Sequence, residues 1–72
     1  MPRYCVNKNA QSGSGDHEVH DLASIKGCLP QESNRIALGY HSSCREAVSA
    51  AKRLHYSDSN GCAHCTPECH TT

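Results

Sequence analysis

The sequence predicts a small α+β fold, in which a two- or three-stranded antiparallel sheet packs on one helix and a cysteine-rich C-terminal tail follows. Three observations lead to this fold class. Short segments in which polar and apolar residues alternate precede residue 41, and such alternation is typical of strands. One later segment has apolar residues at helical spacing. Three of the six cysteines and two of the six histidines lie in residues 61–72, which marks the tail as a separate feature.

The length of 72 residues predicts a single small domain that spans residues 1–72. Chains of this size bury only a modest part of their surface. The sequence has no Phe and no Trp, and its aromatic residues are three tyrosines. Ordering the chain costs about 1.5 kcal/mol per residue, so hydrophobic burial alone leaves a net stability near zero. We therefore expect a bound metal ion or disulfides to stabilise the fold.

The strands are expected in the first part of the chain. Residues 3–7 alternate and are rich in β-forming residues, and residues 16–22 form a second such segment. The Gly/Ser-rich loop 8–15 joins them, which favours an antiparallel hairpin. A third short strand is expected at residues 36–40, where Ile, Leu and Tyr alternate with Ala and Gly.

The helix is predicted from Ser43 to His55. Ser43 is a favourable N-cap, and Glu46 three residues later completes a capping box. Apolar residues recur at helical spacing on one face: Cys44, Ala47, Val48, Ala51 and Leu54. Residues 57–61 are expected to end the helix and lead into the tail.

The tail predicts a zinc site. Cys62 and Cys65 are separated by two residues, so one tight turn can present both thiolates to a metal, and Cys69 is the natural third ligand. Zn²⁺ prefers four sulfur or nitrogen ligands in a tetrahedron. The fourth ligand is expected to be His20 or, failing that, His17 or His70.

A histidine of the hairpin is favoured as the fourth ligand because the adjacent side chains of Cys69 and His70 tend to diverge. His17 and His20 are three residues apart on a predicted strand, so they point to opposite faces and only one can join the metal. Glu18 or Asp16 could orient that histidine through its second ring nitrogen.

Two other interpretations stay open. The tail cysteines could form disulfides without a metal, or Cys44 and the tail could form a thiol or metal sensor. Cys44 could also be a buried thiol, a partner for Cys28 or Cys5, or a ligand together with His41. Whether Cys5, Cys28 and Cys44 are free, paired or ligands is not determined at this point.

Several function classes are disfavoured. The net charge is zero without a basic stripe, which argues against nucleic-acid binding. No apolar run reaches the roughly 20 residues of a membrane span, and the N-terminus has no apolar segment of a secretory signal. Cytoplasmic thiols stay reduced, which favours metal over disulfides. No catalytic constellation is evident. We therefore expect a cytoplasmic structural zinc-binding interaction module and no enzyme, with an unidentified protein as its partner.

Four segments carry a resemblance to a known group of proteins: the string Gly-Asp-His-Glu-Val-His at residues 15–20, Asn-Arg-Ile-x-Leu-Gly at 34–39, Cys-x₂-Ala-Val-x₂-Ala-Lys at 44–52, and Gly-Cys-x₂-Cys-x₃-Cys-His-Thr at 61–71. They are spread over most of the chain, from residue 15 to residue 71, and resemble a group of short uncharacterised bacterial proteins. The resemblance implies a bacterial origin and one compact domain, and it implies no activity.

Overall fold

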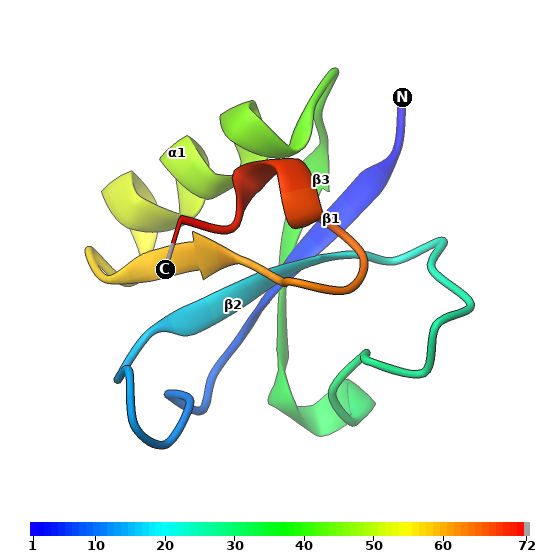
Figure 1. The fold of residues 1–72 in the computed structure, drawn as a ribbon. Helices are drawn as coiled ribbons and strands as arrows, with labels where there is room; N and C mark the ends of the chain where they lie inside the picture. The colour runs from blue at the N-terminus through cyan, green and yellow to red at the C-terminus, as the bar shows by residue number, and fades with distance from the viewer. Residues whose placement is uncertain (72) are drawn as a thin grey trace.

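The computed structural model describes residues 1–71, and in them it contains four β-strands, one α-helix and two 3₁₀ helices. In chain order these are β1 (Arg3–Asn7), β2 (His17–Asp21), η1 (Glu32–Asn34), β3 (Arg35–Tyr40), α1 (Cys44–Leu54), β4 (Ser59–Gly61) and η2 (Pro67–Cys69). The helix lies across one face of the sheet, and the tail folds back beside the helix (Figure 1). The α+β class is as predicted. No helix in this part of the chain is long and apolar enough to cross a membrane.

The sheet has four strands in the order β3-β1-β2-β4. The predicted hairpin is present, since β1 pairs antiparallel with β2, and β3 is antiparallel to the other side of β1. The prediction was wrong in two respects, because β4 is a fourth strand and it runs parallel to β2. The sequence Ser-Asn-Gly of β4 has little β-propensity of its own. Its strand conformation therefore depends on pairing with β2.

A bulge interrupts the pairing of β1 with β3. Tyr4 lies opposite Gly39, whereas Cys5 lies opposite Ala37, so β3 carries one extra residue at this point. Gly39 has φ +80°, a conformation that residues with a Cβ rarely adopt. The bulge therefore depends on the glycine.

The helix begins after Ser43, as the capping residues predicted. The Glu46 backbone N–H donates to Ser43 Oγ over 3.3 Å. The Glu46 carboxylate accepts from the backbone N–H of Ser42 over 3.2 Å, one residue before the position that it reaches in a capping box. Leu54, which the periodicity placed on the apolar face, is exposed at the end of the helix.

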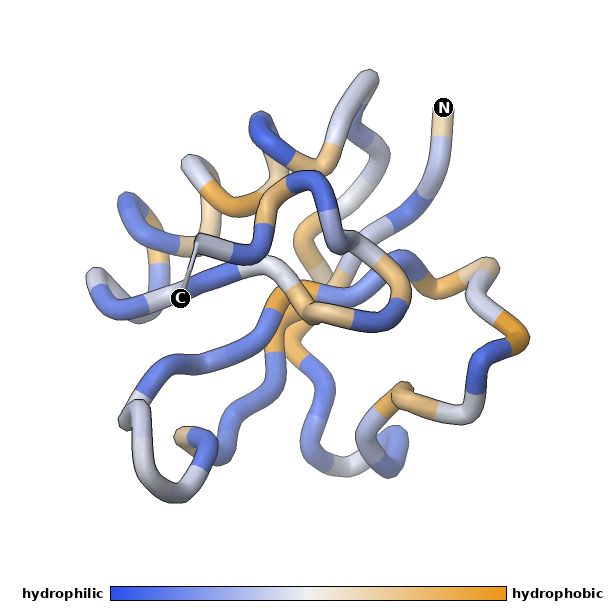
Figure 2. The backbone as a smooth tube through the Cα atoms, viewed as in Figure 1, coloured by the Kyte–Doolittle hydropathy of each residue, from blue (hydrophilic) through white to orange (hydrophobic). Residues whose placement is uncertain are grey.

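The two faces of the sheet differ in chemistry. The face toward α1 carries the apolar core, in which Tyr4, Val6 and Val19 pack against Cys44 and alanines of the helix. Hydrophobic residues of the strands gather in the middle of the sheet, and polar residues lie at the strand ends (Figure 2). Because successive side chains of a strand alternate between faces, Cys5 and His20 lie on the opposite face. Both are buried.

Candidate metal centre

The site is built on a row of residues that crosses the sheet. Cys5 lies directly opposite His20 in the antiparallel pair, so their side chains share a face. Val19 lies beside Gly61 in the parallel pair, and the backbone N–H of Cys62 donates to the Val19 carbonyl over 3.1 Å. His20 follows Val19 in the chain, and Cys62 follows Gly61. The pairing of β2 with β4 therefore brings these two side chains to the same face.

The Cys62–Cys65 segment forms a tight turn that is held by Thr66. The backbone N–H of Thr66 donates to the Cys62 carbonyl over 3.0 Å, and its buried hydroxyl lies 3.0 Å from the Val19 carbonyl oxygen. The backbone N–H of His64 donates to Cys62 Sγ over 3.4 Å. This turn brings Cys65 Sγ to within 3.5 Å of His20 Nδ1.

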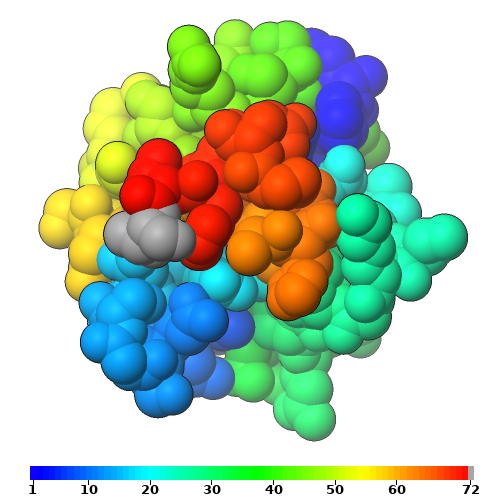
Figure 3. All heavy atoms as spheres, viewed as in Figure 1, coloured from blue at the N-terminus to red at the C-terminus, as the bar shows by residue number. Residues whose placement is uncertain are grey.

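Cys28 comes from the loop 22–31, which covers this side of the molecule. In the space-filling view the orange tail lies directly against the green segment of this loop (Figure 3). The loop starts at a turn in which the backbone N–H of Ala23 donates to the Asp21 carboxylate over 2.9 Å. Ser24 Oγ then lies 4.0 Å from Cys28 Sγ.

Together, His20, Cys28, Cys62 and Cys65 form a cluster whose four ligand atoms all lie within 4.8 Å of one another. Zinc binds sulfur at about 2.3 Å, so thiolates at the corners of a tetrahedron are about 3.8 Å apart. The spacing of the cluster is therefore slightly wider than that of a filled zinc site. Three sulfurs and one imidazole nitrogen are a ligand set that suits zinc.

The environment keeps His20 in the state that a metal requires. Burial and, to a smaller extent, the nearby charge of Arg35 together lower the pKa of His20 to about 4, so the imidazole is neutral at pH 7. Its Nδ1 faces Cys65, and its Nε2 lies 3.9 Å from Glu18 Oε1. Glu18, one of the two carboxylates that the sequence suggested for orienting this histidine, thus lies near its second ring nitrogen but outside hydrogen-bond distance.

In contrast to His20, the Cys65 thiol is held in the protonated form, which does not bind a metal. Burial raises the pKa of Cys65 to about 12, and the neighbouring sulfurs of Cys28 and Cys62 raise it as well. Without a cation, such a thiol holds its proton at pH 7. A divalent cation reverses this preference because it favours the thiolate form of each ligand.

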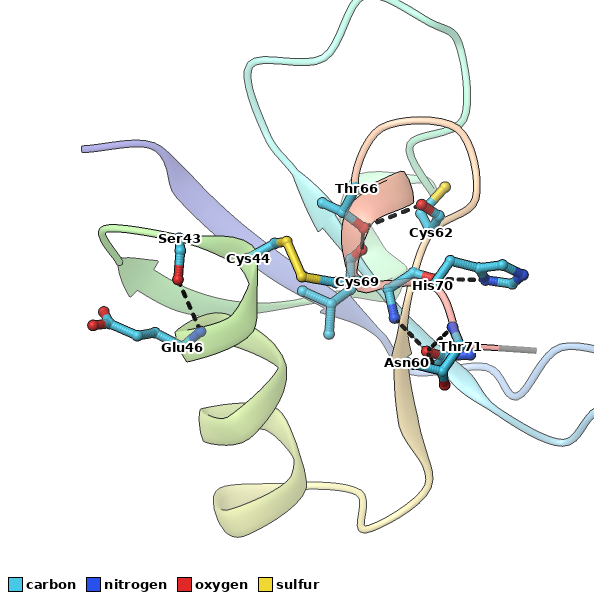
Figure 4. The surroundings of a disulfide bond; sticks show 11 residues. Ser43, Cys44, Glu46, Asn60, Cys62, Thr66, Cys69, His70 and Thr71 are labelled. Carbon is cyan, nitrogen blue, oxygen red and sulfur yellow. Dashed lines mark hydrogen bonds between the residues drawn. A yellow bond between two sulfur atoms is a disulfide. The ribbon is translucent and has the colours of Figure 1, made fainter.

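Three of the six predicted ligands meet in this cluster, namely His20, Cys62 and Cys65. Cys69 instead forms a disulfide with Cys44, so its sulfur is not a free thiol in this structure. Figure 4 shows the side chain of Cys62 pointing away from that disulfide, to the other side of the tail.

The other two predicted histidines have different neighbours. The His17 ring stacks on Tyr56 with a centroid separation of 3.6 Å, and its Nδ1 lies 2.9 Å from the Asn7 carbonyl oxygen. His70 Nδ1 lies 3.0 Å from the Gly61 carbonyl oxygen (Figure 4). Both rings thus contact residues outside the cluster.

The sequence analysis did not assign Cys28 to the site. The one available signal was its position in a short loop directly after the strand that carries His20. Cys5 lies in the same cross-strand row as His20 and is fully buried, but it is not among the four clustered residues. Burial raises the pKa of the Cys5 thiol, which is expected of a thiol inside the fold.

Comparison with known proteins gives no functional assignment, so the proposed function rests on this geometry. No protein-family model, no protein of described function and no solved structure matches the chain.

Proposed function

We propose that this protein is a structural zinc-binding interaction module of the cytoplasm, in which His20, Cys28, Cys62 and Cys65 hold one Zn²⁺. The convergence of these four donor atoms within 4.8 Å carries the proposal. They come from three segments of the chain: β2, the loop 22–31 and the turn after β4. A ligand set assembled from three segments needs the tertiary fold, and in return a metal would cross-link the three segments.

The ligand set favours a structural role over catalysis. Catalytic zinc sites keep one coordination position open for water or substrate, whereas structural sites are closed by four side chains. Here four side chains are available, and the carboxylate of Glu18 lies 3.9 Å from the second ring nitrogen of His20. We therefore propose no enzymatic activity.

The loop 22–31 is the segment that a bound metal would change most. Its hydrogen bonds to neighbouring segments lie at its two ends, near Asp21 at the start and at Pro30, whose carbonyl accepts from Arg35 Nε over 2.8 Å. Cys28 would tie the part between these ends to the sheet. The proposed protein partner would contact this loop once the metal has ordered it.

A second candidate is a domain that is held by disulfides without a metal. The Cys44–Cys69 bond favours it, because stable disulfides are typical of oxidising compartments. The two candidates differ in the state of Cys28, Cys62 and Cys65. In the zinc module these are thiolates that can be alkylated after chelation, whereas in the alternative two of them are oxidised.

The test is to purify the protein without added metal and to measure zinc content together with the number of alkylatable thiols after chelation. We expect one zinc per chain and free thiols at Cys28, Cys62 and Cys65. Substituting Co²⁺ should give the strong thiolate-to-cobalt absorption of a site rich in sulfur. Metal removal should increase amide exchange in the loop 22–31.

Single substitutions then identify the ligands. Cys28→Ser and Cys65→Ser should lose zinc, whereas Cys69→Ser should retain it because Cys69 is bonded to Cys44. Two controls are His64→Ala, an exposed residue inside the same turn, and Cys5→Ala, a buried thiol outside the cluster. Zinc loss in Cys69→Ser with retention in Cys28→Ser would assign the ligands differently. Absence of zinc and of a cobalt spectrum would reject the metal site.

A further inference from the structure

We propose that the Cys44–Cys69 disulfide is a thiol-exchange site, at which a small anionic thiol of the glutathione class attacks Cys69 and displaces Cys44. This inference does not depend on the zinc site, because the disulfide lies on the helix side of the sheet (Figure 4). It assigns a modification site, Cys69, and the chemical class of its partner.

The two sulfurs of the disulfide differ in access. Cys44 is 4% exposed and belongs to the apolar core, whereas Cys69 is only partly buried at the end of η2. Cys69 lines two surface clefts, and Cys44 lines only one of these. A nucleophile in the other cleft therefore meets Cys69 without meeting Cys44. Thiolates attack the sulfur that they can reach, so attack is directed to Cys69.

The cleft that is lined by Cys69 but not by Cys44 has an excess of positive charge. It lies between α1 and the tail, and its charged lining residues are Arg45 and Lys52 against the single carboxylate of Glu68. These two cations and one anion leave an excess of one positive charge. The thiolate of glutathione carries carboxylates as well, so this cleft attracts it more than it attracts the thiolate of a thiol without carboxylates.

The leaving sulfur is also suitably placed. Cys44 is the first residue of α1, directly after the N-cap Ser43. The N-terminus of a helix favours negative charge, and it stabilises cysteine thiolates. A leaving thiol that is stable as a thiolate departs faster.

The exchange step balances without an added oxidant or reductant. The attacking thiolate forms a bond to Cys69 Sγ, the bond between Cys69 and Cys44 breaks, and Cys44 takes the electron pair as a thiolate. The products are a mixed disulfide on Cys69 and a free Cys44. The tail then loses its covalent link to α1, while the Thr66 hydroxyl still holds it to the Val19 carbonyl of β2.

The experiment treats the folded, full-length protein with limiting reduced glutathione, stops exchange with acid and maps the mixed disulfide by peptide mass spectrometry. We expect the adduct on Cys69. An adduct that forms mainly on Cys44, or reaction only after unfolding in urea, would overturn the proposal.

Charge variants provide the matched control. Lys52→Glu should slow the reaction with glutathione by about fivefold at low salt, because the cleft then repels the anionic thiol, and added salt should reduce the effect. The thiolate of 2-mercaptoethanol carries one negative charge fewer than the thiolate of glutathione, so Lys52→Glu should slow its reaction less. The variant Arg53→Glu, which alters another cleft of the same helix, should not slow the reaction with glutathione in this way. Equal slowing of both thiols would contradict the proposed role of the cleft.

A second pair of variants tests access directly. In Cys44→Ser, the free Cys69 should form a mixed disulfide readily with oxidised glutathione. In Cys69→Ser, the buried Cys44 should react much more slowly. Equal or reversed rates would show that Cys69 is not the accessible sulfur.

Discussion

The two faces of the sheet are held in different ways. The face toward α1 has an apolar core built from Tyr4, Val6 and Val19 against helix alanines, and a disulfide closes it. The opposite face carries Cys5, His20 and the sulfurs of Cys62 and Cys65, and the loop 22–31 covers it. Apolar packing contributes to the stability of the first face, whereas buried thiols and an imidazole add little apolar area. The second face therefore has the composition of a candidate metal site.

The tail contributes cysteines to both faces of the sheet. Cys62 and Cys65 lie with His20 on one side, and Cys69 bonds to Cys44 on the other. Gly61 separates the two sides, since a Cβ at this position would lie 2.7 Å from the backbone and Cβ of Cys69. The close approach of η2 to β4 thus requires a glycine here, and it allows one short segment to be cross-linked in both directions.

Removing both cross-links should have the largest effect. The double variant Cys65→Ser with Cys69→Ser loses a zinc ligand and the disulfide, and the core contains no Phe or Trp to compensate. We expect no cooperative transition in a urea titration followed by circular dichroism. The double variant Cys5→Ala with His64→Ala keeps both cross-links and should retain the transition. A transition in the first variant close to that of the unmodified protein would show that packing alone holds the fold.

Removing the disulfide alone should have a smaller effect. The bond closes a separation of 25 residues, for which loop-closure entropy predicts a loss of about 3 kcal/mol. Urea titration of Cys44→Ala with Cys69→Ser, in the presence of zinc, measures this loss. The variant should still bind one zinc per chain. Loss of zinc along with the disulfide would mean that the two faces depend on one another.

The metal-free protein should become less stable in acid. The pKa of His20 is about 4 in the fold against an ordinary value of 6.5, so between these values the unfolded chain binds a proton that the folded chain does not. Stability therefore falls as pH decreases from 6.5 to 4, by on the order of 3 kcal/mol.

Urea titrations of the chelated, disulfide-intact protein at several pH values measure this slope. His20→Gln should remove this contribution, and His64→Ala should keep it. If His20→Gln shows the same pH slope as the unmodified protein, the buried imidazole is not its source.

The smallest effect is expected at the start of α1. Ser43→Ala removes the side-chain oxygen that accepts from the Glu46 N–H, at a cost of about 1 kcal/mol. Ser57→Ala is the control, because Ser57 is an exposed serine in the turn after the helix, away from the cap. Chemical denaturation of both variants measures the difference. Equal stability of the two variants would mean that the serine cap adds nothing here.

Local signals in the sequence were sufficient for several elements. Alternation and the Gly/Ser loop predicted the hairpin of β1 and β2, and Ser43 with Glu46 predicted where α1 begins. The association of the Cys62–Cys65 turn with a hairpin histidine was also predicted, because a spacing of two residues suits one metal. The hairpin, the helix start and the Cys62–Cys65 pair depend on residues that are close in sequence, whereas a hairpin histidine was expected because the adjacent side chains of Cys69 and His70 tend to diverge.

The tertiary structure alone decided the remaining features. β4 forms because its backbone pairs with β2, and nothing in Ser-Asn-Gly favours a strand. That pairing sets Gly61 beside Val19 and hence Cys62 beside His20. It also turns Cys69 toward α1 and Cys44, and the loop 22–31 brings Cys28 to the place that Cys69 was expected to fill. The partner of a cysteine depends on where distant segments meet in space, and spacing along the chain determines this only within a single turn.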